Sequence, residues 1–155
     1  MLARELVLSY RPSGSGLQPD PAPACLRTPA QTAAYLAELQ PTAGIPWEAE
    51  AVESFMVLLV DVKHRPIAYH LVSRGTLDAC LVHAREVFRA AIAGGAAAII
   101  VAHNHPSGDP APSADDCTLT RRLSEGGELL GIPVLDHVVL GTEGRYSSFR
   151  ELGLL

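Results

Sequence analysis

The sequence has few cysteines, no long apolar run and no excess of positive charge, and each shortage excludes a class of protein. Only three cysteines occur among its 155 residues. Cys25, Cys80 and Cys117 are widely spaced and form no Cys-x-x-Cys pair, so we expect neither a disulfide framework nor a structural zinc finger. The longest wholly apolar run, Ala96 to Ala102, is far too short to cross a bilayer.

Acidic residues outnumber basic ones, which gives a formal net charge of −5 at pH 7. A chain of this charge has no general attraction to nucleic acid. The first ten residues reach polar positions too early for a signal peptide, so we expect a cytoplasmic protein without membrane attachment. Hydrophobic residues make up 48% and charged residues 19% of the chain. These proportions, with the length, predict one globular domain with a substantial core.

The chain divides into a lead segment, residues 1–47, and a body, residues 48–155. Within the lead, the alternating residues 2–10 are typical of an edge strand, and the Pro/Gly/Ser-rich residues 12–23 are typical of a linker. Thr28 and Pro29 have the character of an N-cap and a first helical residue, and they predict a helix that continues to about Gln40.

The body alternates buried-type strands with amphipathic helices. Strands are predicted at residues 55–61, 66–73, 96–102 and 133–140, and helices at residues 79–93 and 113–130. Long apolar strands that alternate with helices favour a layered α/β domain with helices on both faces of the sheet.

Residues 103–116 carry the strongest chemical signal. His103 and His105 lie two positions apart directly after a buried strand, and side chains at that spacing share one face of extended backbone. Asp116, in the first turn of the next helix, is the candidate third ligand. Two histidines and one carboxylate, with water in the fourth position, form a hydrolytic zinc site. Ligand type alone leaves iron and manganese open.

Asp116 also fits a second interpretation. It occupies the N3 position of a capping box in which Ser113 is the N-cap, and the pattern alone favours neither interpretation over the other. If Asp116 is not the ligand, Asp115 is the nearest substitute. Ser113 is suited to two tasks, since it can cap the helix and direct its hydroxyl into the site.

The spacing His-x-His, seven residues, Ser, two residues, Asp resembles the metal motif of the JAB/MPN (JAMM) metalloprotease family. The strings HNHPSG, PSADD, GIPVLDHVVLG and YSSF are similar to its RadC-like branch, and the resemblance runs from about residue 50 to the C-terminus. It implies a three-layer, MPN-like α/β fold, related to the cytidine deaminases, in which helices flank a mixed sheet.

The resemblance also implies roles for particular residues. His103, His105 and Asp116 would bind zinc, and Ser113 would help to stabilise the oxyanion. Glu53 matches a glutamate that precedes an early strand as Glu-x-Phe and takes a proton from the activated water. Glu50 and then Glu48 are the alternatives. His137 belongs to an Asp-His pair that also resembles the family, and we expect it to support the structure or the site and not to bind metal.

The function implied is that of a zinc-dependent hydrolase that cleaves an amide or isopeptide bond in a peptide or protein substrate. One alternative is a DNA-repair-associated protein or metal-dependent nuclease, although residues 1–47 lack the helix-hairpin-helix pattern of longer RadC-like proteins. A non-catalytic MPN interaction module is disfavoured, because all the expected ligands are present. A nucleobase deaminase is excluded, since it needs His-x-Glu followed by Pro-Cys-x-x-Cys. The sequence predicts neither the physiological substrate nor the oligomeric state.

Overall fold

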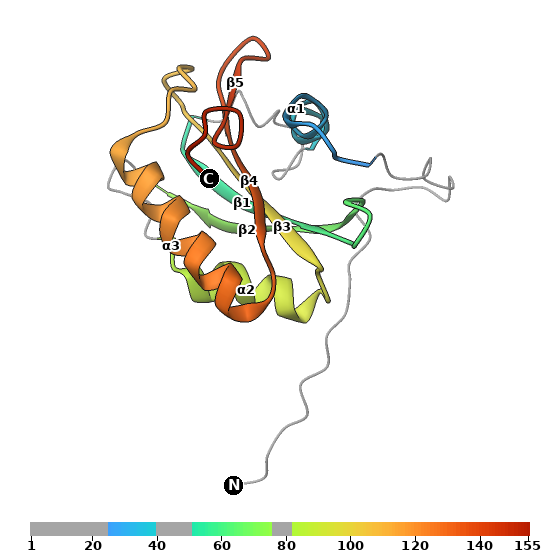
Figure 1. The fold of residues 1–155 in the computed structure, drawn as a ribbon. Coiled ribbons are helices and arrows are strands. Elements are labelled where there is room, and N and C mark those ends of the chain that lie inside the picture. The colour runs from blue at the N-terminus through green and yellow to red at the C-terminus, as the bar shows by residue number, and fades with distance from the viewer. Residues whose placement is uncertain (1–24, 40–50, 76–81) are drawn as a thin grey trace, which may run out of the picture.

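The computed structural model describes residues 25–39, 51–75 and 82–155. Within these ranges the elements follow in the order shown in Figure 1. They are α1 (Pro29–Glu38), β1 (Ser54–Val60), β2 (Pro66–Arg74), α2 (Ala84–Ala93), β3 (Ala98–Asn104), α3 (Ala114–Leu130), β4 (Val134–Leu140) and β5 (Tyr146–Ser148).

The strands form a mixed sheet in the order β2-β1-β3-β4-β5. β1 is antiparallel to both β2 and β3, β3 is parallel to β4, and β4 is antiparallel to β5. The parallel pair is joined through α3, because two parallel strands need a crossover connection. The C-terminal ends of β3 and β4 therefore lie at the same edge of the sheet.

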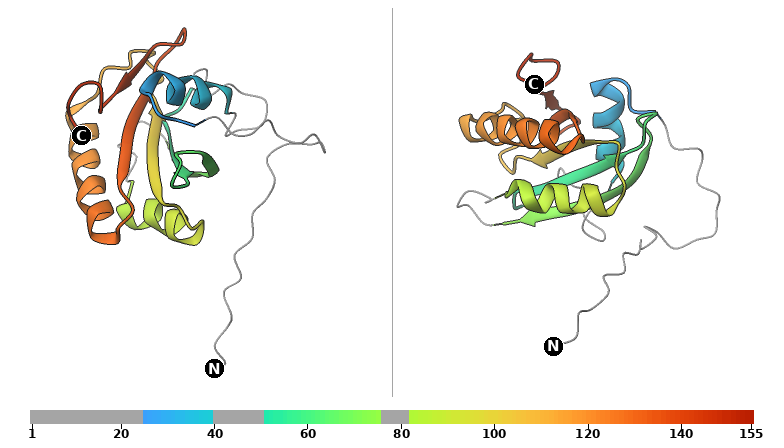
Figure 2. Two further views of the ribbon diagram at one scale, coloured as in Figure 1. Left: turned by 45° about the vertical axis from the view of Figure 1, so that its right-hand side comes forward. Right: turned by 60° about the horizontal axis from the view of Figure 1, so that its bottom comes forward.

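Helices cover both faces of this sheet, with α1 on one side and α2 and α3 on the other (Figure 2). Side chains alternate along the strands, so that Leu58 and Ile100 pack in a core with Leu36 of α1. Val57 and Val101 point the opposite way, into a core that includes helices α2 and α3. Every residue of β1 and β3 is buried, as expected for strands covered on both faces. The three-layer, MPN-like arrangement predicted from the sequence is confirmed.

The predicted helix after Thr28 is present and ends at Glu38. The Thr28 hydroxyl accepts a hydrogen bond from the Gln31 N–H, and the Gln31 side chain accepts one from the Thr28 N–H, which completes a capping box. The strand predicted at residues 2–10 lies outside the described residues.

The boundaries of α2 and β3 differ most from the prediction. α2 begins at Ala84 and not at residue 79, because His83 has extended backbone and is the N-cap; residues 79–81 are not described. β3 begins at Ala98, after the positive φ of Gly95, and extends to Asn104 through its pairing with β4. Short β5 was not predicted as a strand. No helix in the described part of the chain is long and apolar enough to cross a bilayer.

Candidate metal centre

The site is built at the C-terminal end of β3. His103 is a fully buried strand residue, paired with Phe55 of β1 and with Val139 of β4. His105 lies just past the strand, where its N–H donates to the Leu140 carbonyl at 3.0 Å. That bond keeps the chain alongside β4, so both imidazoles stay on the face covered by α3.

The loop that follows turns the chain back toward the histidines. Gly108 has a φ of +79°, and a Cβ at this position would meet the Thr142 side chain at 2.6 Å. The Thr142 N–H donates to the Gly108 carbonyl at 3.2 Å. Only glycine permits both the backbone conformation and the close approach. The loop is thereby fixed against residues 141–142, and α3 begins close to the end of β3.

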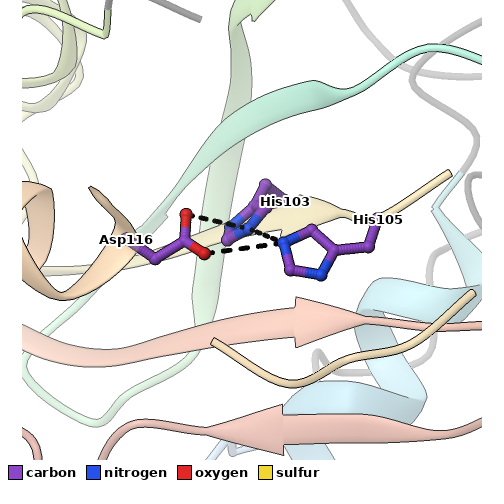
Figure 3. Close-up of side chains that lie close together, drawn as sticks. All are labelled: His103, His105 and Asp116. Carbon is purple, nitrogen blue, oxygen red and sulfur yellow. Dashed lines mark hydrogen bonds and ion pairs between the residues drawn. The ribbon is translucent and has the colours of Figure 1, made fainter. Parts of the chain in front are cut away.

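Three predicted ligands meet at this point (Figure 3). His103 Nε2 lies 3.2 Å from Asp116 Oδ1, and His105 Nε2 lies 3.5 Å from Asp116 Oδ2. The two Nε2 atoms are 3.0 Å apart. Among the described residues, this is the one group of three or more His, Cys, Asp or Glu side chains with ligand atoms close enough to share an ion.

The charges of the site are coupled. Burial alone would raise the pKa of Asp116, but hydrogen bonds with His103 and His105 outweigh it and bring this pKa far below its ordinary value. The hydrogen bond to Asp116 also raises the pKa of His105, against the opposing effect of partial burial. Asp116 is therefore an ionised carboxylate in the folded protein.

The proton on His105 can be located from its hydrogen bond. His105 Nδ1 lies 2.7 Å from the Asp109 carbonyl oxygen, which can only accept, so Nδ1 carries the proton. When the imidazole is neutral, its lone pair is therefore on Nε2, the nitrogen on the side of Asp116; when it is protonated, Nε2 donates to Asp116 instead. Imidazole nitrogen beside an anionic oxygen is a donor set that suits zinc and related divalent metals, so these residues fit a metal ion.

Asp116 is the N3 residue of the capping box, and its position is also compatible with the ligand role that the sequence left open. Its Oδ2 accepts hydrogen bonds from the Ser113 N–H at 2.8 Å and from the Ser113 hydroxyl at 2.6 Å, as in a capping box. Its Oδ1 faces His103. The cap thus holds the carboxylate in the orientation that a ligand needs, whereas Asp115 is exposed and outside the group of ligand atoms.

Glu53 precedes β1 and is half-buried. The hydrogen bond to Asp116 is the largest cause of the raised pKa of His105, and the charge of Glu53 raises that pKa further, which places Glu53 within electrostatic reach of the site. Its role as general base stays a prediction. The alternatives, Glu48 and Glu50, lie outside the described residues.

His137 was expected to have a supporting role, and Thr120 was not singled out at all. His137 is fully buried, with Nε2 2.8 Å from His103 Nδ1 and Nδ1 2.6 Å from the Thr120 hydroxyl. Burial lowers the pKa of His137 well below its ordinary value, so its imidazole is neutral. The sequence signal for Thr120 is its position four residues after Asp116, which places it on the same side of α3.

Comparison with known proteins gives a consistent picture. The model of the RadC-like JAB domain matches residues 26–154. A UPF0758 protein of Symbiobacterium thermophilum is 55% identical over 105 residues, which cover 68% of this chain and 44% of that protein. UPF0758 proteins of Geobacter sulfurreducens and Methanosarcina barkeri are 52% and 48% identical over 103 residues, 66% of this chain and 44% of each relative. The chain thus spans less than half of the length of these relatives.

Proposed function

This chain belongs to the RadC-like JAB domain family, a family of JAMM-type metal-dependent hydrolases, and on that premise we propose that it is a zinc-dependent hydrolase of peptide or isopeptide bonds. The observation that carries the proposal is the convergence of His103 Nε2, His105 Nε2 and the Asp116 carboxylate at the end of a buried strand.

In the proposed hydrolysis, the metal and two residues of the protein have separate roles. A bound Zn²⁺ would supply Lewis acidity, which polarises a carbonyl and makes water more acidic. Glu53 would accept the proton from the attacking water and pass it to the leaving amine. Ser113 is exposed at the N-terminus of α3. Its one hydroxyl proton is donated to Asp116 in this structure, and it would have to turn to the substrate to donate to the developing oxyanion.

The charge around the site favours a peptide over a nucleic acid. Glu53, Asp109 and Asp115 stand close to the ligands in sequence or in space, and the last two are exposed. A phosphodiester backbone would be repelled by these carboxylates, whereas a polypeptide carries no such obligatory charge. The same argument applies at long range, because the whole chain has a net charge of −5.

The test begins with metal content. We expect about one zinc per chain in the wild type and none in the double variant His103→Ala/His105→Ala, measured by elemental analysis. The wild type should then cleave members of a peptide and isopeptide library. Glu53→Gln should keep the zinc and lose the cleavage. A wild type that binds no metal after reconstitution with zinc would overturn the proposal, as would full activity in Glu53→Gln.

A further inference from the structure

A continuous line of buried polar contacts leads from α3 to His103. The Thr120 hydroxyl lies 2.6 Å from the Asp116 carbonyl oxygen and 2.6 Å from His137 Nδ1. His137 Nε2 lies 2.8 Å from His103 Nδ1. Thr120, His137 and His103 are all fully buried, so the partners of these groups are the protein groups named, and each proton on the line can be assigned.

The donor and acceptor of each hydrogen bond in the line follow from the hydroxyl of Thr120. A backbone carbonyl only accepts hydrogen bonds, so the one proton of the Thr120 hydroxyl must lie between Thr120 and the Asp116 carbonyl. The same hydroxyl can then only accept from His137, which places a proton on His137 Nδ1. A neutral imidazole with a proton on Nδ1 has an acceptor at Nε2, and that acceptor takes the proton of His103 Nδ1. In the neutral imidazole of His103 the lone pair is then on Nε2, which lies 3.2 Å from Asp116 Oδ1.

The rings are held in this orientation by aromatic packing. Phe55 stacks on His103 with ring centroids 6.0 Å apart and planes inclined by 14°. Phe149 stacks on His137 at 4.6 Å and 18°. Rotation of either ring would break these stacks as well as the hydrogen bonds, so the proton positions are coupled to the packing of the core.

We propose that His137 and Thr120 are positioning residues that fix the proton of His103 on Nδ1 and so present Nε2 to the metal. The proposal rests on the proposed function in one respect, that His103 binds the metal. The proton of the second predicted ligand, His105, is fixed separately, because its Nδ1–H donates to the Asp109 carbonyl of the loop. The line also joins two ligands to each other, since it starts at the backbone of Asp116 and ends at the ring of His103.

The experiment removes the Thr120 hydroxyl without removing any ligand. In Thr120→Val, His137 loses its acceptor at Nδ1, and the favoured tautomer becomes the one that donates from Nε2 to His103. We expect zinc affinity to fall about 10-fold to 100-fold, measured by competition with a chromophoric chelator. Thr120→Ser, which keeps the hydroxyl, should restore wild-type affinity.

Thr118 supplies the matched control. It lies on the same helix, and its hydroxyl donates to the Ala114 carbonyl at 3.0 Å in the same i to i−4 geometry, but on the exposed side. Thr118→Val should leave zinc affinity unchanged. Equal losses of affinity in Thr118→Val and Thr120→Val, or an unchanged affinity in Thr120→Val, would overturn the proposal.

A second readout does not depend on metal. Long-range ¹H–¹⁵N NMR of the metal-free protein reports which ring nitrogen of each neutral histidine carries the proton. We expect Nδ1–H for His137 in the wild type and Nε2–H in Thr120→Val. A proton on Nε2 of His137 in the wild type would refute the assignment. A wild type that shows Nδ1–H but binds no zinc would instead overturn the proposed function.

Discussion

Asn104 lies between the two predicted histidine ligands in sequence, but its side chain binds the segment that carries Glu53. Its Oδ1 accepts from the Ser54 N–H at 2.8 Å, and its Nδ2 donates to the Val52 carbonyl at 3.2 Å. Asn104 is buried and therefore fixes the backbone on both sides of Glu53. The residue between the ligands thus sets where the carboxylate of the predicted base can be.

Replacement of Asn104 should separate positioning of Glu53 from metal binding. We expect Asn104→Ala to retain bound zinc and to lose about 10-fold or more of kcat, because a base displaced by about 1 Å acts poorly. Loss of one buried and one partly buried hydrogen bond should also lower the free energy of unfolding by about 1–3 kcal/mol. Zinc titration, kinetics and urea denaturation measure the three effects. A loss of zinc equal to that in His105→Ala would contradict the expectation.

Residues that depend on local backbone were predictable, and residues that depend on tertiary register were not. His103 and His105 face the same way because they are two positions apart near a strand end, and Ser113 and Asp116 form a capping box within one helical turn. Thr120 meets His137 only because α3 packs on β4 across 17 positions of sequence. No local pattern encodes that contact, so it required the structure.

At the scale of elements, the C-terminal half of α3 contains two adjacent glycines where helix propensity would favour alanine. A Cβ on Gly127 would meet the Ile132 carbonyl oxygen at 2.6 Å, and one on Gly126 would meet the Phe88 ring at 3.2 Å. β1 and β3 could be predicted from continuous apolar runs because both of their faces are buried, and the helices could be predicted from apolar residues at helical spacing because each buries one face. The starts of α1 and α3 follow from their capping residues. The start of α2 at Ala84 and the end of β3 at Asn104 could not be predicted, because His83 caps α2 without a side-chain hydrogen bond and pairing with β4 extends β3.

Alanine substitutions at these two glycines form a matched pair of variants. We expect Gly127→Ala to lower the free energy of unfolding by about 1–3 kcal/mol, because backbone must move to admit the methyl group. Gly126→Ala should be close to neutral, since a small shift of the Phe88 ring relieves its contact while alanine contributes about 1 kcal/mol of helix propensity. Urea denaturation measures both. A destabilisation of Gly126→Ala as large as that of Gly127→Ala would show that the close approach to Ile132 is not the cause.

The turn between β1 and β2 should be sensitive to acid. Hydrogen bonds from the Arg65 side chain and backbone lower the pKa of Asp61 to about 2 from 3.8. A depressed pKa means that the ionised carboxylate favours the folded state. Its contribution to stability is therefore present above pH 3.8 and disappears as the pH falls toward about 2. Wild type should be more stable than Asp61→Asn near neutral pH, and unfolding measured over a pH series should show this difference vanish in that window. A difference that stays constant down to pH 2 would contradict the prediction.

At the scale of the whole molecule, the metal site lies at the edge of a core that is complete without it. The sheet is covered on both faces, α3 has its own cap, and two of the predicted ligands, His103 and Asp116, are part of these elements. Residues 148–150 are also tied to β4, because Asp136 accepts hydrogen bonds from the Ser148 hydroxyl and the Arg150 N–H. The fold therefore contrasts with small zinc domains, which unfold without metal.

Removal of metal should lower stability without unfolding the protein. At a free zinc concentration 100 times the dissociation constant, binding contributes about 2.7 kcal/mol, and its loss should lower the Tm by roughly 5–10 °C for a chain of this size. Thermal scans with and without chelator measure the shift. Far-UV circular dichroism at 25 °C should be unchanged on chelation. Collapse of the helical signal would show that the fold depends on the ion.

The two carboxylate oxygens of Asp116 have different partners, and this has a consequence for the order in which such a site could lose its residues in evolution. One oxygen of this carboxylate caps α3 and the other faces the histidine of β3, so a descendant that no longer bound metal would still be selected to keep the aspartate as a helix cap. The side chain of His105 contributes less to the fold than that of Asp116, since His105 lies past the strand and its side chain is 18% exposed. Among relatives of this chain, the identity of the residue at position 105 should therefore mark the loss of activity sooner than the aspartate does.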